Sequence, residues 1–163
     1  MQQNFPQLRS ALIADKQSRH CNRRQSSMET DFLDAHQRHW DDAERLYNSQ
    51  RWANADHLYG VSAECGMKRL MIEFGMPLGN RGPAEREDRE HIDNLWMRYE
   101  SYRTGHHRGA GYALSDSNPF QDWHISQRYA PQTRFDQTRT RGHRTAAQSI
   151  RALVRKAEQE GLL

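Results

Sequence analysis

Apolar residues recur at helical spacing along most of the chain after residue 30. In residues 30–48 they occupy one side, Trp40 and Leu46 among them, while charged residues occupy the opposite side, which predicts an amphipathic helix. Residues 51–75 are apolar on two sides, so they predict a central helix that packs between other elements. Because residues 49 and 50 alone separate the two segments, we expect an antiparallel helical hairpin.

Two segments rich in glycine and proline divide the rest of the chain. Residues 76–83 end the hairpin, and residues 104–120 predict a long loop. Helical spacing returns in residues 84–103, in a short segment at 123–129 and in a last helix over 138–159. No alternating run is long enough to predict a strand. We therefore expect an all-α protein, a four- to five-helix up-and-down bundle over residues 30–163, after a basic N-terminal tail over residues 1–29.

Length and composition indicate which classes of protein this chain can belong to, and they leave the predicted fold unchanged. The 163 residues suit one domain, and no apolar run approaches the length that crosses a bilayer. The N-terminus lacks the apolar core of a signal peptide, so we expect a soluble, cytoplasmic protein. The two cysteines, Cys21 and Cys65, have neither metal-ligand spacing nor a disulfide framework. No phosphate loop or dinucleotide fingerprint is present, and we predict no cofactor.

Positive charge is concentrated late in the chain and is carried almost entirely by arginine, with 21 Arg against 3 Lys. Residues 29–56 contain seven acids and three arginines, whereas residues 128–156 contain eight basic residues and one acid. Guanidinium groups bind phosphates in a bidentate manner, so this local field favours RNA, a nucleotide or another polyanion as partner. The candidate phosphate-binding residues are Arg128, Arg134, Arg141 and Arg144.

Several polar residues fall on the inward sides of the predicted hairpin. Asp56 lies among Trp52 and Tyr59, where an unpaired carboxylate would be costly, so it needs a histidine or arginine partner. We predict a polar core network; its members are His36, His39, Asp56, His57, Glu64 and Lys68. A metal site is the alternative for this cluster. The Glu-x-x-His motif of di-metal bundles is absent, so we predict no metal.

Three separated stretches together resemble one family. They are RWANADHLYGVSAECGMKRLM at 51–71, HIDNLW at 91–96 and WHISQRY at 123–129. In this order and spacing, and in the residues Ala63, Glu64 and Lys68, the chain resembles the HEPN superfamily (higher eukaryotes and prokaryotes nucleotide-binding) over about residues 30–163. The resemblance implies a helical bundle, usually a homodimer, found in toxin–antitoxin and phage-defence systems. Such proteins act as metal-independent RNases or bind nucleotides or nucleic acids.

The RNase members of that family carry an arginine, four to six residues and then a histidine at the start of a late helix. There the arginine holds a phosphate and the histidine handles the proton of the attacking 2′-OH. In this chain Arg139 and His143 are the matching residues, but only Thr140, Arg141 and Gly142 separate them. We therefore favour a non-catalytic module that binds a nucleotide, nucleic acid or a partner protein encoded nearby. The alternatives are an RNase that uses Arg139 and His143, and a helical-bundle metal-binding protein.

Overall fold

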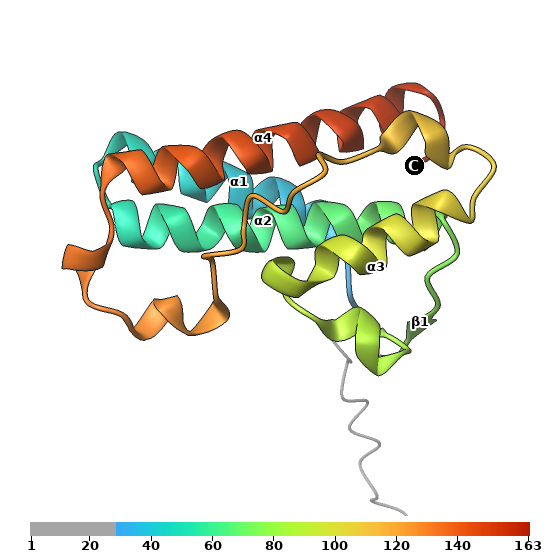
Figure 1. Cartoon of the computed structure of the whole chain (residues 1–163), viewed down its shortest axis with the longest axis horizontal. Helices are drawn as coiled ribbons and strands as arrows, with labels where there is room; N and C mark the ends of the chain where they lie inside the picture. Colours follow the sequence, from blue (N-terminus) through green and yellow to red (C-terminus); the bar gives the residue numbers. More distant parts are fainter. Residues whose placement is uncertain (1–28) are drawn as a thin grey trace, which may run out of the picture.

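The computed structural model describes residues 29–163, which form an all-α bundle as the sequence predicts (Figure 1). Almost all of the predicted N-terminal tail, Cys21 included, lies outside the described residues. Within them, no helix combines the length and the apolarity that a membrane crossing requires. The four main helices are α1 (Phe32–Asn48), α2 (Trp52–Glu73), α3 (Ile92–Thr104) and α4 (Gln137–Gln159).

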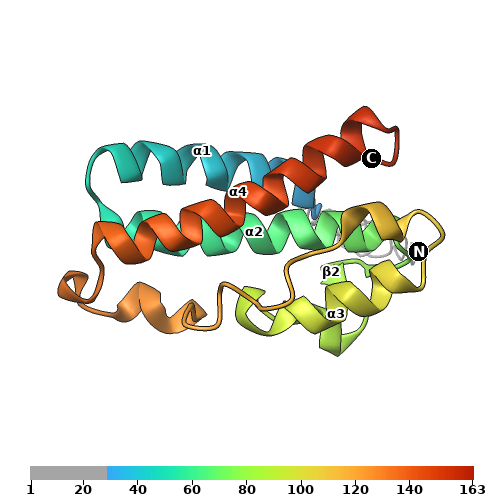
Figure 2. The ribbon, with the colours of Figure 1, turned by 45° about the horizontal axis from the view of Figure 1, so that its top comes forward.

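α2 lies at the centre of the bundle, and α1, α3 and α4 all pack against it (Figures 1 and 2). The two apolar sides seen in the sequence explain this position: Tyr59, Ala63 and Leu70 are fully buried. α1 runs antiparallel to α2, but α3 and α4 run in the same direction as α2. The up-and-down alternation therefore holds only for the first hairpin, because the long connections 74–91 and 105–136 carry the chain back before the next helix begins.

Aspartates begin the first and last helices. Asp31, and not its neighbour Thr30, caps α1, because its side chain accepts hydrogen bonds from the backbone N–H groups of Leu33 and Asp34, both at 3.0 Å. Asp136 caps α4 in the same way, by accepting from the N–H of Arg139 at 2.8 Å. The cap at Asp136 sets where α4 begins, and so sets the face on which each later side chain lies.

The segment predicted as one helix over residues 84–103 is divided. A 3-10 turn, η1 (Arg86–Arg89), occupies its first part, and α3 starts only after it. Just before the segment, β1 (Leu78–Gly79) pairs antiparallel with β2 (Gly82–Pro83). Asp88 of η1 turns inward and is fully buried. Its buried carboxylate accepts hydrogen bonds from Arg98 Nε at 2.8 Å and Tyr102 Oη at 2.7 Å. These contacts fasten the turn to α3.

The connection between α3 and α4 forms three 3-10 turns: η2 (Gly109–Tyr112), η3 (Ile125–Tyr129) and η4 (Gln132–Arg134). Its aromatic side chains Phe120 and Trp123 are buried in the main core. Trp123 packs directly on the backbone of α2 at Gly60, where a Cβ atom would lie 2.2 Å from the indole ring. The indole Nε1 also donates to the backbone oxygen of Asp56 at 3.2 Å. The absence of a side chain at Gly60 therefore allows the α3–α4 connection to pack closely against α2.

We predict that Gly60→Ala destabilises the protein by about 1–3 kcal/mol, because the added methyl group must displace the Trp123 ring. Urea unfolding followed by circular dichroism measures the change. Gly142→Ala is the matched control, since Gly142 lies inside α4 with no atom within 4 Å of the new Cβ. That variant should be stabilised by up to about 1 kcal/mol. Equal stability of the two variants would contradict the close packing of Trp123 against α2 at Gly60.

Candidate functional site

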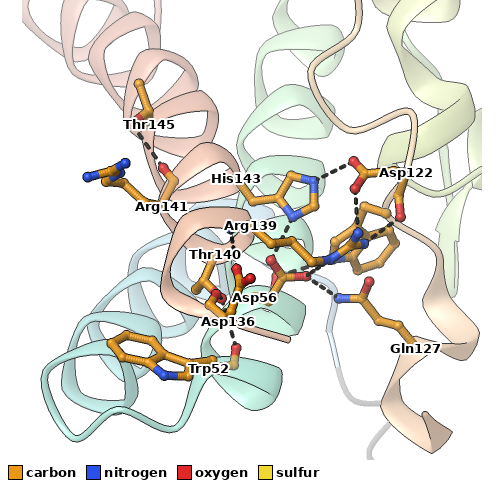
Figure 3. Close-up of polar contacts among 11 residues, drawn as sticks. Trp52, Asp56, Asp122, Gln127, Asp136, Arg139, Thr140, Arg141, His143 and Thr145 are labelled. Atoms are coloured by element: carbon orange, nitrogen blue, oxygen red, sulfur yellow. Dashed lines mark hydrogen bonds and ion pairs between the residues drawn. The ribbon is translucent and has the colours of Figure 1, made fainter. Parts of the chain in front are cut away.

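The most concentrated polar site in the described part of the chain is formed where α2, η3 and the start of α4 meet (Figure 3). Asp56 of α2 is fully buried, and one of its carboxylate oxygens accepts a hydrogen bond from Nδ1 of His143 at 2.7 Å. The other oxygen accepts from Nε2 of Gln127 at 2.9 Å. A carboxylate can only accept, so Asp56 fixes a proton on Nδ1 and orients the imidazole. The ring of His143 also stacks on Phe120, with centroids 5.2 Å apart.

Asp122 and Arg139 complete the site on its solvent side. Nε2 of His143 lies 3.0 Å from one carboxylate oxygen of Asp122, and a guanidinium nitrogen of Arg139 contacts the other oxygen. Arg139 also donates to the backbone oxygen of Asp122 at 2.6 Å and lies 3.8 Å from Asp56. Partial burial opposes ionisation of Asp122, but its contacts with His143 and Arg139 lower its carboxyl pKa below the usual value.

This cluster is open to solvent on one side. His143, Arg139 and Asp122 line a cavity of ≈ 450 Å³, and Arg139 and Asp122 also line a neighbouring hollow of ≈ 830 Å³. The Asp122 side chain is 61% exposed, whereas those of Asp56 and His143 are 0% and 4% exposed. The inner pair is therefore held in place by the core, while Asp122 can leave without opening the core.

The four-position interval between Arg139 and His143 explains why they meet. On an α-helix, residues i and i+4 lie on the same face one turn apart. The interval thus places both side chains toward Asp122, although it is shorter than the interval of the family's RNase motif. Arg139 and His143 were predicted from the sequence as a candidate pair. In the structure they lie in one site with Asp56.

The four candidate phosphate-binding arginines do not lie together. Arg128, Arg134 and Arg141 are exposed, and Arg134 lines the same hollow as Arg139. Arg144 lies on the α1 side of α4, where Nε and Nη2 each donate to the Glu44 carboxylate at 2.7 Å. This bidentate pair occupies the donors that a phosphate would need.

The six residues predicted as one polar network are placed in separate contacts. Asp56 joins His143, as described. Glu64 lies between Lys68, with Nζ at 2.7 Å, and Nδ1 of His91 at 2.9 Å. The contact with Glu64 raises the pKa of His91. His39 of α1 and His57 of α2 are partly buried, and burial lowers the pKa values of both. The ring of His57 stacks on Trp123.

His36 is buried in the core. Its Nδ1 donates to the backbone oxygen of Ser62 at 2.8 Å, while its Nε2 has no hydrogen-bond partner among residues 29–163. Burial lowers the pKa of His36; the Ser62 contact opposes this shift, and the positive charges of Arg151 and Arg155 add to it.

Over residues 29–163 no three His, Cys, Asp or Glu side chains gather in a way that could hold a metal ion. The metal-binding alternative therefore has no cluster to support it in that range. Buried Cys65 does not offer a reactive thiol, because burial raises its pKa to about 12.

Sequence reasoning did not assign Asp122, Gln127 or His91 to a site. Asp122 and Gln127 belong to an irregular connection whose path no periodicity predicts, and His91 precedes α3 by one residue. The only signal for a partner was Asp56 itself, an ionisable residue on an apolar face that required one.

Comparison with protein-family models, with curated proteins and with solved structures finds no match to this chain.

We predict that acid destabilises the protein in part through His36. Its pKa is lower in the folded chain than in the unfolded chain, so stability is full above about pH 6.5 and falls as pH decreases below that value. One such group contributes a slope of up to about 1.4 kcal/mol per pH unit. In urea unfolding from about pH 7.5 to about 5.5, His36→Gln should reduce the loss of stability with acid. His107→Gln, at an exposed loop position, should leave the slope unchanged; equal slopes in all three proteins would contradict the prediction.

Proposed function

We propose that the protein is a HEPN-like RNase that cleaves RNA without a metal ion, with Arg139 and His143 as its catalytic residues. The observation that carries this proposal is the 2.7 Å contact between buried Asp56 and Nδ1 of His143, beside the guanidinium of Arg139. An imidazole oriented by a carboxylate is suited to proton transfer, and an adjacent guanidinium is suited to a charged phosphate. The same-face placement of Arg139 and His143 supports it further, since the shorter interval in the sequence does not separate them.

The chemistry requires Asp122 to leave Nε2 of His143, and the proton that Nε2 donates to the Asp122 carboxylate to pass to solvent with it. With Nδ1–H held by Asp56, the free Nε2 accepts the proton of an RNA 2′-OH, and the 2′ oxygen forms a bond to phosphorus. The P–O5′ bond breaks, and the leaving oxygen takes a proton from solvent or from a second acid. The products are a 2′,3′-cyclic phosphate and a 5′-OH. Arg139, released from Asp122, stabilises the charge that develops on the phosphate oxygens.

Assembly is part of the same proposal. The resembled RNases place the sites of two copies opposite each other over the RNA, so we propose that this protein acts as a homodimer. Light scattering at micromolar concentration tests this part, and a monomer mass would count against it.

We predict that the purified protein cleaves mixed-sequence RNA in EDTA and leaves 2′,3′-cyclic phosphate ends. His143→Gln should slow cleavage about 100-fold or more, because the amide can still donate to Asp56 but cannot accept and return a proton. Gel electrophoresis of end-labelled RNA measures the rate. A melting curve close to that of the unsubstituted protein shows that the variant remains folded.

His107→Gln is the matched control for cleavage, since it removes an imidazole from an exposed loop residue. Its rate should equal that of the unsubstituted protein. Cleavage that persists in His143→Gln, or that requires a divalent metal, would contradict the assignment of Arg139 and His143.

A non-catalytic RNA-binding module is the second candidate, and a different observation favours it. The carboxylate of Asp122 contacts both Arg139 and Nε2 of His143, so the site contains an internal anion and the imidazole has no free nitrogen. A module that only binds RNA would need the same arginine but no free base.

We predict that Asp122→Asn tightens RNA binding several-fold at low salt, because it removes the carboxylate that competes with phosphate for Arg139. The side chain of Asp122 is 61% exposed, so the fold should tolerate the change. Fluorescence anisotropy with a labelled RNA gives the affinity. Tighter binding without any cleavage in EDTA would favour the non-catalytic candidate, and unchanged affinity would contradict competition by Asp122.

A further inference from the structure

A second groove lies between α1 and α4, on the side of α4 that carries Arg144. α1 and α4 both pack against α2 and leave a hollow of ≈ 480 Å³ between them. Its wall on α1 includes Trp40 and Glu44, and its wall on α4 is formed mainly by basic and amide side chains. The groove is thus distinct from the Asp56 and His143 site, which is on the side of α4 that faces η3.

The donors of α4 in this groove form one stripe. They occupy positions separated by four, three, four and four residues, which keeps them on a single helical face: Arg144, Gln148, Arg151, Arg155 and Gln159. At 1.5 Å per residue the stripe is about 22 Å long. A row of donors of this length suits an extended, repeating anion better than one compact phosphate group.

Two basic residues of the groove form close ion pairs, and two do not. Arg144 is paired with Glu44, and Lys156 at the edge of the groove is paired with Glu160 at 2.9 Å. Arg151 and Arg155 have no carboxylate within 4 Å among residues 29–163. The guanidinium of Arg151 lies 5.1 Å over the ring of Trp40, and its buried Nε has no hydrogen-bond partner among the residues that the structure describes.

Burial is the largest cause that lowers the pKa of Arg151, and the positive charge of Arg155 lowers it further. The carboxylates of Asp41, Glu44 and Glu158 oppose this shift without outweighing it. The same two arginines add to the lowering of the His36 pKa behind the groove. An anion bound between Arg151 and Arg155 would satisfy the free Nε of Arg151 and remove the repulsion between the two guanidinium groups.

We infer that this groove binds the phosphate backbone of single-stranded RNA, with Arg151 and Arg155 contacting adjacent phosphates. The inference depends on the proposed function only in the choice of RNA as the polyanion, because the groove contains no acid–base pair. Binding here does not use Asp122, Arg139 or His143. The groove would hold one part of an RNA strand along α4 while another part of the same RNA lies at the site of Arg139 and His143.

The test measures binding of a fluorescently labelled 2′-O-methyl RNA, which cannot be cleaved, to the full chain over a range of salt concentrations. The double variant Arg151→Gln and Arg155→Gln should bind about tenfold more weakly at low salt. The slope of log affinity against log salt should fall by about 1.4, since each phosphate contact on a single strand contributes about 0.7. The single variant Arg155→Gln removes an exposed side chain, so it should stay folded and should lower the slope by about 0.7.

The matched control is Arg81→Gln with Arg86→Gln, which removes two exposed arginines outside the groove. An unchanged affinity and slope in the groove variants, or an equal loss in the control, would overturn the inference. Displacement of the RNA by ADP at a concentration near the RNA Kd would overturn the assignment to a strand and point to a free nucleotide. Because the probe cannot be cleaved, a protein without RNase activity can still pass this test.

Discussion

The buried carboxylate of Asp56 is the constraint on which the rest of the structure depends. A fully buried anion without partners would cost several kcal/mol, and Asp56 meets this cost through His143 at 2.7 Å and Gln127 at 2.9 Å. These partners come from α4 and η3, so one residue of α2 fixes the positions of both elements. The bond from Trp123 to the backbone oxygen of Asp56 fastens the connection at the same point. Removing Asp56 would therefore affect folding and the candidate site together.

The outer part of this cluster is built differently from the inner part. Asp56 and His143 are enclosed by the core, whereas Asp122 is largely exposed on an irregular connection. The outer carboxylate can thus exchange with an external anion at little cost to the fold. This difference in burial separates an orienting carboxylate from a displaceable one, and the proposed chemistry uses both roles.

α4 presents different chemistry on its two sides. Toward η3 it carries Arg139 and His143, which meet two carboxylates. Toward α1 it carries Arg144, which meets Glu44, and also Arg151 and Arg155, which have no carboxylate within 4 Å in the described part of the chain. Among the acidic residues of the first hairpin, Glu44 pairs directly with the start of the basic stripe at Arg144, whereas Asp41 and Glu44 act on Arg151 only from a distance. Glu44 and Arg144, which belong to the acidic and the basic part of the sequence, meet between α1 and α4 although they are 100 positions apart.

The sequence by itself determined the helices, because helical spacing and capping are local properties. It indicated the central role of residues 51–75, the first hairpin and the late helix with Arg139 and His143. It also indicated that Asp56 needed a partner, but not which one, since His143 lies 87 positions away. Only the tertiary structure decided that α3 and α4 run parallel to α2, because long connections impose no direction on the next helix. It alone placed Asp122 against His143 and, within residues 29–163, left Arg151 and Arg155 without a carboxylate closer than 4 Å. Such contacts depend on how distant segments pack, which the period of apolar residues along one segment does not specify.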